Sequence, residues 1–206
     1  MKKRGKIILI IFSSIVILTG ITIPLLPFIL QYQPAYGTPT FEFPVAEPMN
    51  ITSLSAYNIP NWGEPGVFHN GIDLVISGPT QLISPCYGII TRIWYNINPY
   101  VGGEVAMIHV QITVNYAWSV KLVFEPFANT TEIRDRQLEL IVTKVGTRVE
   151  PGDLVGTLLW STNYPHLHYM IMNNGDDVNP YIYSSSTAQA IFDEIAERTN
   201  STIYYP

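Results

Sequence analysis

The sequence predicts an all-β domain. Between about residues 51 and 183, short apolar runs rich in Val, Ile and Tyr are separated by Gly, Pro and Asn, which is the pattern of short strands joined by turns. No sustained helical period occurs among these runs. The exception follows them, where Ser186–Asn200 places apolar residues at helical spacing. The chain therefore combines a β domain with a short C-terminal helix.

Seven strands are predicted from the apolar runs and the turn residues that bound them. They are Gly71–Ile76, Cys86–Asn96, Val105–Val114, Ser119–Phe124, Leu138–Val145, Asp153–Leu159 and His166–Met172. In the C-terminal segment, Ala190, Ile191 and Ile195 stand at helical spacing, and the helix is expected to pack on the β domain. Thr187 is the expected N-cap of this helix. No internal repeat is visible.

The chain begins with a basic head and an uncharged apolar run. The run from Ile7 to Leu30 has 24 residues, which is enough to cross a bilayer. It exceeds the roughly 7–15 residues of a signal-peptide core, so an uncleaved anchor is favoured over a cleaved signal. No Lys or Arg follows Lys6 until Arg92, so the basic head is expected in the cytoplasm. We predict a single-pass cell-membrane protein with an extracytoplasmic C-terminal domain.

Composition divides the whole chain into four segments. Residues 1–30 hold the basic head and the transmembrane signal-anchor, 31–50 form a Pro-rich spacer, 51–183 form the β domain, and 184–206 form a tail with the short helix. Three Asn-x-Ser/Thr sequons agree with an exterior location and with a glycoprotein. They begin at Asn50, Asn129 and Asn200.

Charge and cysteine content exclude several classes of protein. The net charge is −5, and four of the eleven basic residues lie in the first six positions. The remaining chain has seven basic against sixteen acidic residues and no basic patch, so nucleic acid is not an expected partner. The single cysteine, Cys86, excludes an intrachain disulfide and any metal site built from several cysteines.

Histidines and an aspartate form two clusters. His166 and His168 are two residues apart in a predicted strand, so both imidazoles point to one face. His69 and Asp73 are four apart, with Gly71 between them to let the chain turn or approach closely. Imidazole and carboxylate are typical zinc ligands, and catalytic zinc sites commonly use three protein ligands.

A zinc site could use His69, Asp73 and one histidine of the second cluster. The spacing does not decide whether His166 or His168 is the ligand. A zinc ion would lower the pKa of a water molecule toward about 7 and make it a usable nucleophile. The remaining histidine could act as a general base or stabilise an oxyanion. The alternative is that His166 and His168 are ordinary polar residues on a solvated face of the strand and bind no metal.

These motifs resemble the lysostaphin-type (LytM-like) zinc metallopeptidases. The family motif H-x-G-x-D corresponds to His69–Asp73, and its H-x-H motif to His166–His168. Between them, Ser84–Ile90 ("SPCYGII") and Val149–Gly156 ("VEPGDLVG") match two further family segments. The resemblance covers about Asn61–Tyr183.

The resemblance implies a fold, a metal site and an activity. The fold would be a compact antiparallel β-sandwich with zinc in a groove. His69, Asp73 and His168 would be the zinc ligands, and His166 would be catalytic. The reaction would be hydrolysis of peptide bonds, in peptidoglycan or another cell-envelope peptide. An envelope protein is a further possible partner, because family members without catalytic residues act as binding or activating modules.

The sequence departs from this family at one position. A second catalytic histidine is usual between the two zinc motifs, but the corresponding stretch Trp118–Thr131 has none. Glu125 lies nearest to the expected place, and His109 lies one strand earlier. Glu125 could act as a catalytic acid or base, as carboxylates do in other zinc peptidases. Alternatively, catalysis has been lost and the zinc groove binds a ligand, or Glu125 is a solvated residue.

Aromatic residues are further candidates for the groove. Asn163–Pro165, before the histidine pair, could form part of its rim. The tryptophans could line the groove or pack in the core, and we expect most of them in the core. They are Trp62, Trp94, Trp118 and Trp160.

Overall fold

The structure is a computed structural model that describes residues 37–101 and 103–203. The predicted transmembrane segment, residues 7–30, and the first part of the predicted spacer lie outside these residues. Within the described ranges, no helix has the length and apolar character needed to cross a bilayer.

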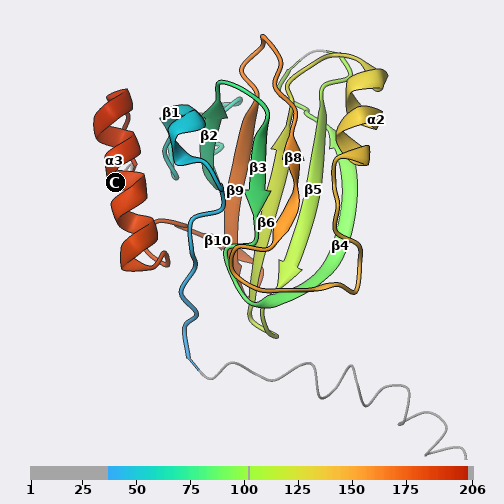
Figure 1. The fold of residues 1–206 in the computed structure, drawn as a ribbon. Helices are drawn as coiled ribbons and strands as arrows, with labels where there is room; N and C mark the ends of the chain where they lie inside the picture. Colours follow the sequence, from blue (N-terminus) through green and yellow to red (C-terminus); the bar gives the residue numbers. More distant parts are fainter. Residues whose placement is uncertain (1–36, 102, 204–206) are drawn as a thin grey trace, which may run out of the picture. The chain divides into compact units, whose positions relative to one another are not determined.

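The described chain is mostly β and is built on one antiparallel sheet of eight strands (Figure 1). In spatial order its strands are β1 (Ile51–Ser55), β2 (Ile72–Ile76), β9 (His166–Asn173), β6 (Trp118–Glu125), β5 (Ala106–Thr113), β4 (Gly88–Ile97) and β7 (Arg148–Val149), and β10 (Asp176–Val178) pairs with β9. Strands β3 (Thr80–Ile83) and β8 (Leu154–Leu158) form a second sheet of two strands. The helices are η1 (Pro48–Asn50), α2 (Thr131–Glu139) and α3 (Ser186–Thr199).

The core lies between the large sheet and the small one. Because side chains alternate along a strand, each central strand of the large sheet buries every second residue in this core. The inward residues of β9 and β6 are fully or almost fully buried: Leu167, Tyr169, Ile171, Val120, Leu122 and Phe124. The small sheet adds Leu82, Val155 and Leu158 to the same core. The opposite face of the large sheet carries polar side chains next to apolar ones such as Val123 and Met170.

The C-terminal helix α3 forms where the sequence predicts it. Its N-cap is Ser185 rather than Thr187, because the Ser185 hydroxyl accepts the Ala188 N–H. Phe192 is fully buried on the inner face of α3. Its ring meets that of Phe43 edge to face, with centroids 4.9 Å apart. Asn200 ends the helix in the left-handed conformation.

Part of the predicted spacer packs onto the domain. Phe41, Phe43 and Val45 are buried in the core. Phe41 also pairs with Ser184, since its N–H donates to the Tyr183 carbonyl at 3.0 Å. The packed unit therefore begins before residue 51.

Six of the seven predicted strands are present, but the strand predicted at Leu138–Val145 is wrong. Thr130 caps a helix instead, because its hydroxyl accepts the Ile133 N–H. The resulting helix α2 ends at Glu139, and Ile141 then forms a single bridge to Gly156. Isolated backbone hydrogen bonds link this run to β8, including that from the Val142 N–H to the Val155 carbonyl at 3.0 Å, but no regular strand forms, and some of its apolar side chains are exposed. They include Val142 and Val145.

Phe192→Ala tests whether α3 is part of the cooperative unit. Truncating a fully buried aromatic side chain leaves a cavity, so the free energy of unfolding should fall by about 3–5 kcal/mol. Urea unfolding of the full-length protein measures this change. Glu194→Ala, at an exposed site of the same helix, should change it by less than about 0.5 kcal/mol. Equal losses of the free energy of unfolding in the two variants would contradict the packing of α3 against the β domain.

Candidate metal centre and groove

Three neighbouring strands place the predicted site residues on one face. In the register of β2 and β9, Asp73 lies opposite His168. In the register of β9 and β6, His168 lies opposite Val123 and His166 lies opposite Glu125. Directly opposite side chains share a face of a sheet. His69 joins them from the segment before β2, where its N–H donates to the Ile59 carbonyl at 2.9 Å.

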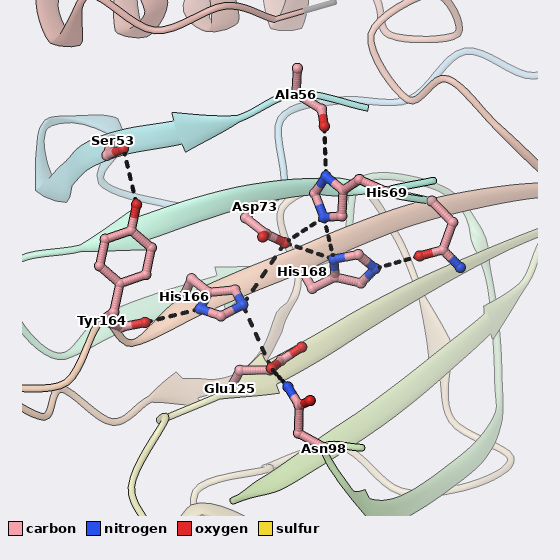
Figure 2. A network of polar contacts seen from close by, with 10 residues as sticks. Ser53, Ala56, His69, Asp73, Asn98, Glu125, Tyr164, His166 and His168 are labelled. Atoms are coloured by element: carbon pink, nitrogen blue, oxygen red, sulfur yellow. Dashed lines mark hydrogen bonds and ion pairs between the residues drawn. The ribbon is translucent and has the colours of Figure 1, made fainter. Parts of the chain in front are cut away.

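His69, Asp73 and His168 form a compact cluster (Figure 2). Asp73 Oδ1 lies 2.6 Å from His168 Nδ1 and 3.1 Å from His69 Nε2. The two imidazole nitrogens are 3.2 Å apart. Tetrahedral zinc with ligands at about 2.0–2.1 Å separates its ligand atoms by about 3.3 Å. Two of the three separations, 3.1 and 3.2 Å, are close to this value, whereas the 2.6 Å pair would have to open by about 0.7 Å around an ion, and all three atoms have the chemistry of zinc ligands.

Hydrogen bonds outside the cluster fix the ring orientation of both of its histidines. The Nδ1–H of His69 donates to the Ala56 carbonyl at 2.6 Å, so Nε2 faces inward with its lone pair. The Nε2–H of His168 donates to Asn70 Oδ1 at 3.2 Å, which leaves Nδ1 facing inward. Asn70 is itself oriented, because its amide group donates to Asp177 at 2.9 Å. Both inner nitrogens are thus free to bind a cation.

Gly71 has the close approach that the sequence suggested. A Cβ at this position would lie 2.7 Å from His168 Cε1 and 2.7 Å from the Tyr169 carbonyl oxygen. Any side chain at residue 71 would therefore displace the His168 ring. The glycine of the first motif is required by the packing of the second motif.

His166 sits beside the cluster. Its Nδ1–H donates to the Tyr164 carbonyl at 2.9 Å, so Nε2 points toward the site (Figure 2). Nε2 lies 3.6 Å from Glu125 Oε2 and 3.9 Å from Asp73 Oδ1. Tyr164 adopts a left-handed backbone conformation with φ 65°, which is uncommon for a bulky residue. This local conformation belongs to the turn that leads directly into His166.

Glu125 is only 4% exposed, so its interpretation as a solvated residue is wrong. Asn98 donates to Glu125 Oε2 at 3.2 Å. Burial raises the pKa of the Glu125 carboxyl, although the neighbouring histidines oppose this effect. A carboxyl group with a raised pKa, aimed at an imidazole, is suited to proton transfer.

Asp73 has the opposite electrostatic setting. Burial disfavours its charge, but His166, His168 and His69 outweigh burial and lower the pKa of its carboxyl below the ordinary value. The two acidic groups of the site therefore have pKa values shifted in opposite directions. Asp73 is thereby kept charged, and Glu125 more readily carries a proton.

These residues open into a groove with a volume of about 500 Å³. Aromatic side chains line part of it, including Tyr164, as predicted, and Tyr100 and Phe127. Trp62 also lines it, with its ring centroid 4.2 Å from that of His69. The expectation that most tryptophans lie in the core is wrong, because only Trp118 is buried.

His109 lies on β5, one strand from Glu125, and also lines the groove. Its ring stacks on Trp94 with centroids 4.5 Å apart. Its Nε2–H donates to Asn96, and its buried Nδ1 has no partner among the described residues. Burial, with Lys121 next in importance, lowers the pKa of His109 to about 4. His109 is therefore a neutral groove residue outside the metal cluster.

Three groove residues were not foreseen from the sequence. Asn70 lies inside the first motif and could have been noticed as a neighbour of its ligands. Asn98 follows β4 and carries no sequence signal, because only the tertiary fold brings it to Glu125. Lys121 lies on the groove face of β6, two residues from Val123.

No protein-family model matches the sequence, and no curated protein sequence matches it. Similar solved structures include a zinc-containing peptidase from Vibrio cholerae, with 18% identity, a TM-score of 0.48, and coverage of 68% of this chain and 39% of that one. The SpoIIQ–SpoIIIAH pore-forming complex is similar with 15% identity, a TM-score of 0.49, and coverage of 76% and 98%. The catalytic domain of lysostaphin from Staphylococcus simulans has 20% identity, a TM-score of 0.43, and coverage of 66% and 93%.

The structural neighbours thus include the lysostaphin type that the sequence motifs indicated. This chain spans only 39% of the length of the Vibrio cholerae peptidase. At these identities and TM-scores, the neighbours assign no activity to the present chain.

The buried neutral state of His109 predicts a pH dependence of stability. Its folded-state pKa of about 4 lies below the ordinary value of 6.5, so unfolding takes up about one proton at this site between those pH values. The His109 contribution to stability is present above pH 6.5 and is lost as the pH falls toward 4. In His109→Gln, the free energy of unfolding should therefore fall less steeply over this window.

Urea unfolding at several pH values measures this difference. Gln111→Ala, which changes the next position on the same face of β5 without removing a titratable group, should keep the wild-type slope. A wild-type slope in His109→Gln would contradict the prediction.

Proposed function

We propose that this chain is a zinc metallopeptidase of the lysostaphin type that hydrolyses peptide bonds. The observation that carries the proposal is the set of three inward ligand atoms, His69 Nε2, Asp73 Oδ1 and His168 Nδ1, which lie 2.6–3.2 Å apart. Their outer hydrogen bonds orient both imidazoles for a cation, as is usual around metal-ligating histidines. The nitrogen and oxygen donors and the three-ligand number fit a catalytic zinc site.

When bound, zinc would polarise a peptide carbonyl and lower the pKa of a water molecule. The other steps belong to side chains of the chain. His166 holds its proton on Nδ1, against the Tyr164 carbonyl, so Nε2 is free to accept a proton from the attacking water. Glu125 lies 3.6 Å from Nε2 and can exchange a proton with it. Asn98 holds the Glu125 carboxyl in place.

The groove supports a peptide as substrate. Its open walls combine aromatic rings with amide groups, and such walls suit an extended peptide better than a small charged metabolite. With the anchor predicted for residues 7–30, the substrate would be a cell-envelope peptide, such as one in peptidoglycan. In this proposal the protein is a single-pass membrane protein whose domain acts outside the cytoplasm.

One observation favours a second candidate function. The position opposite His166 carries Glu125, where the resembled peptidases usually have a histidine in this region. If Glu125 cannot serve the reaction, the groove would bind an envelope peptide or a partner protein without cleaving it. The metal site would then organise a binding surface.

Zinc content tests the ligand set. Full-length protein should contain about one zinc ion per chain, and His168→Ala should lose it because only two ligands remain. His109→Ala is the matched control, since it removes a groove histidine outside the cluster and should retain zinc. Elemental analysis of folded protein gives the answer. A zinc-free wild type, or full zinc content in His168→Ala, would rule out this site.

Peptide cleavage tests the reaction. Full-length protein should cleave peptidoglycan or peptides of glycine and D-amino acids, and a chelator should abolish the cleavage. Glu125→Gln should lower kcat by about 10²–10⁴-fold, because proton transfer is lost while the side-chain shape is kept. Zinc content should not change in this variant.

Glu139→Gln, at an exposed carboxylate on α2, should keep wild-type cleavage. Unchanged activity in Glu125→Gln would remove the proposed proton-transfer role. If no peptide is cleaved by zinc-loaded protein, the binding function is favoured.

A further inference from the structure

On the face of the sheet that carries the metal cluster, two rows of paired side chains cross the strands, and the members on β9 and β6, with His109 on β5, line the groove. The first row contains His168, Val123, His109 and Trp94, each paired with the next across neighbouring strands. The second row lies two residues further along each strand. It contains Met170, Lys121, Gln111 and Arg92.

The second row is positively charged. Lys121 is the one Lys or Arg among the described residues that line the groove. Neither Lys121 nor Arg92 forms an ion pair within the described part of the chain. Arg92 is held at the edge of this row, with its guanidinium carbon 4.4 Å from the centre of the Trp94 ring.

The charges of the groove are therefore separated. Asp73 and Glu125 lie at the metal end, and Lys121 and Arg92 lie one row or more away. An anionic group would be repelled by the carboxylates and attracted by the second row. This separation can fix the direction in which a charged peptide lies.

The spacing of the rows matches an extended peptide. Two residues of a β-strand advance by about 6.6–6.8 Å, both in β6 and in a peptide laid along it. A group bound at Lys121 is therefore displaced by about two peptide residues from a bond held beside His168.

We propose that Lys121 forms a subsite that binds a carboxylate of the peptide substrate about two residues from the cleaved bond, and that Arg92, two strands away in the same row, adds to the positive potential there. The carboxylate belongs either to the peptide C-terminus or to an acidic side chain. This inference rests on the proposed peptide-binding function and adds a substrate class to it. Val123 and Met170 provide the apolar floor between this subsite and the metal cluster.

One set of synthetic peptides tests the subsite. A neutral pentapeptide amide of glycine and D-alanine is compared with the same peptide as a free acid, and with an amide that carries one Glu two residues after its centre. Full-length zinc-loaded protein should favour at least one of the two acidic forms by about tenfold in kcat/KM, as expected for one charge-assisted contact at a partly exposed site. Which form is favoured identifies the source of the carboxylate.

Variants assign the preference to the second row. Lys121→Gln should bring the ratio of acidic to neutral peptide close to one, and Lys121→Arg should retain the preference. Lys144→Gln, an exposed lysine outside the groove, is the matched control and should keep the wild-type ratio. Equal kcat/KM for all three peptides in the wild type, or an undiminished ratio in Lys121→Gln, would overturn the subsite.

Binding separates this inference from the proposed activity. The Kd of each peptide, measured by calorimetry, should show the same tenfold preference and the same loss in Lys121→Gln. If no peptide is cleaved but this pattern of Kd values is found, the proteolytic function fails and the subsite stands. If peptides are cleaved without any preference in kcat/KM or Kd, the function stands and the subsite fails.

Discussion

The pairing register of β9 with its two neighbours is the constraint on which the site depends. On one face β9 buries Leu167, Tyr169 and Ile171 in the core, and on the other it presents His166 and His168. A shift of one residue would exchange the two faces, and it would bury imidazoles while exposing three large apolar side chains. The hydrophobic core therefore sets the position of the metal-site residues, although it does not touch the ion site. Neighbouring strands then add Asp73 and Glu125 at fixed positions.

The hydrogen-bond partners and the burial of each site residue determine which role that residue can take in the site. Three histidines each donate one ring N–H outward, to Ala56, Asn70 and the Tyr164 carbonyl, and each turns its other nitrogen inward. The two carboxyl groups differ as well, because Asp73 faces three imidazoles whereas Glu125 is dominated by burial. Ligand and proton-transfer roles can thus be separated by environment alone. The roles proposed for His168 and His166 follow from their partners, not from their identity.

The sequence was sufficient to predict structure and site residues where one local pattern specifies both. Alternation in His166–Met172 indicates both the strand and the shared face of its histidines, and the resemblance supplied their assignment to separate roles. It was insufficient where tertiary packing decides. The apolar run at Leu138–Val145 reads as a strand, but the helix capped by Thr130 extends into it, and the rest makes only a single bridge to β8 at Ile141. Asn98 reaches Glu125 only through the fold, and the burial of Glu125 depends on surrounding elements that periodicity does not reveal.

The outward hydrogen bonds of His69 and His168 bear on the order in which the protein folds and binds an ion. They exist in the chain itself, so the ligand atoms are already oriented before any ion arrives. The core on the far face of the sheet also contains none of these ligands. If the cluster holds zinc as proposed, folding and metal loading would be separate events, unlike in small zinc domains that unfold without their ion. Such a domain would stay folded when zinc is scarce and bind the ion later, so the active fraction of the protein would follow the supply of zinc and not the rate of synthesis.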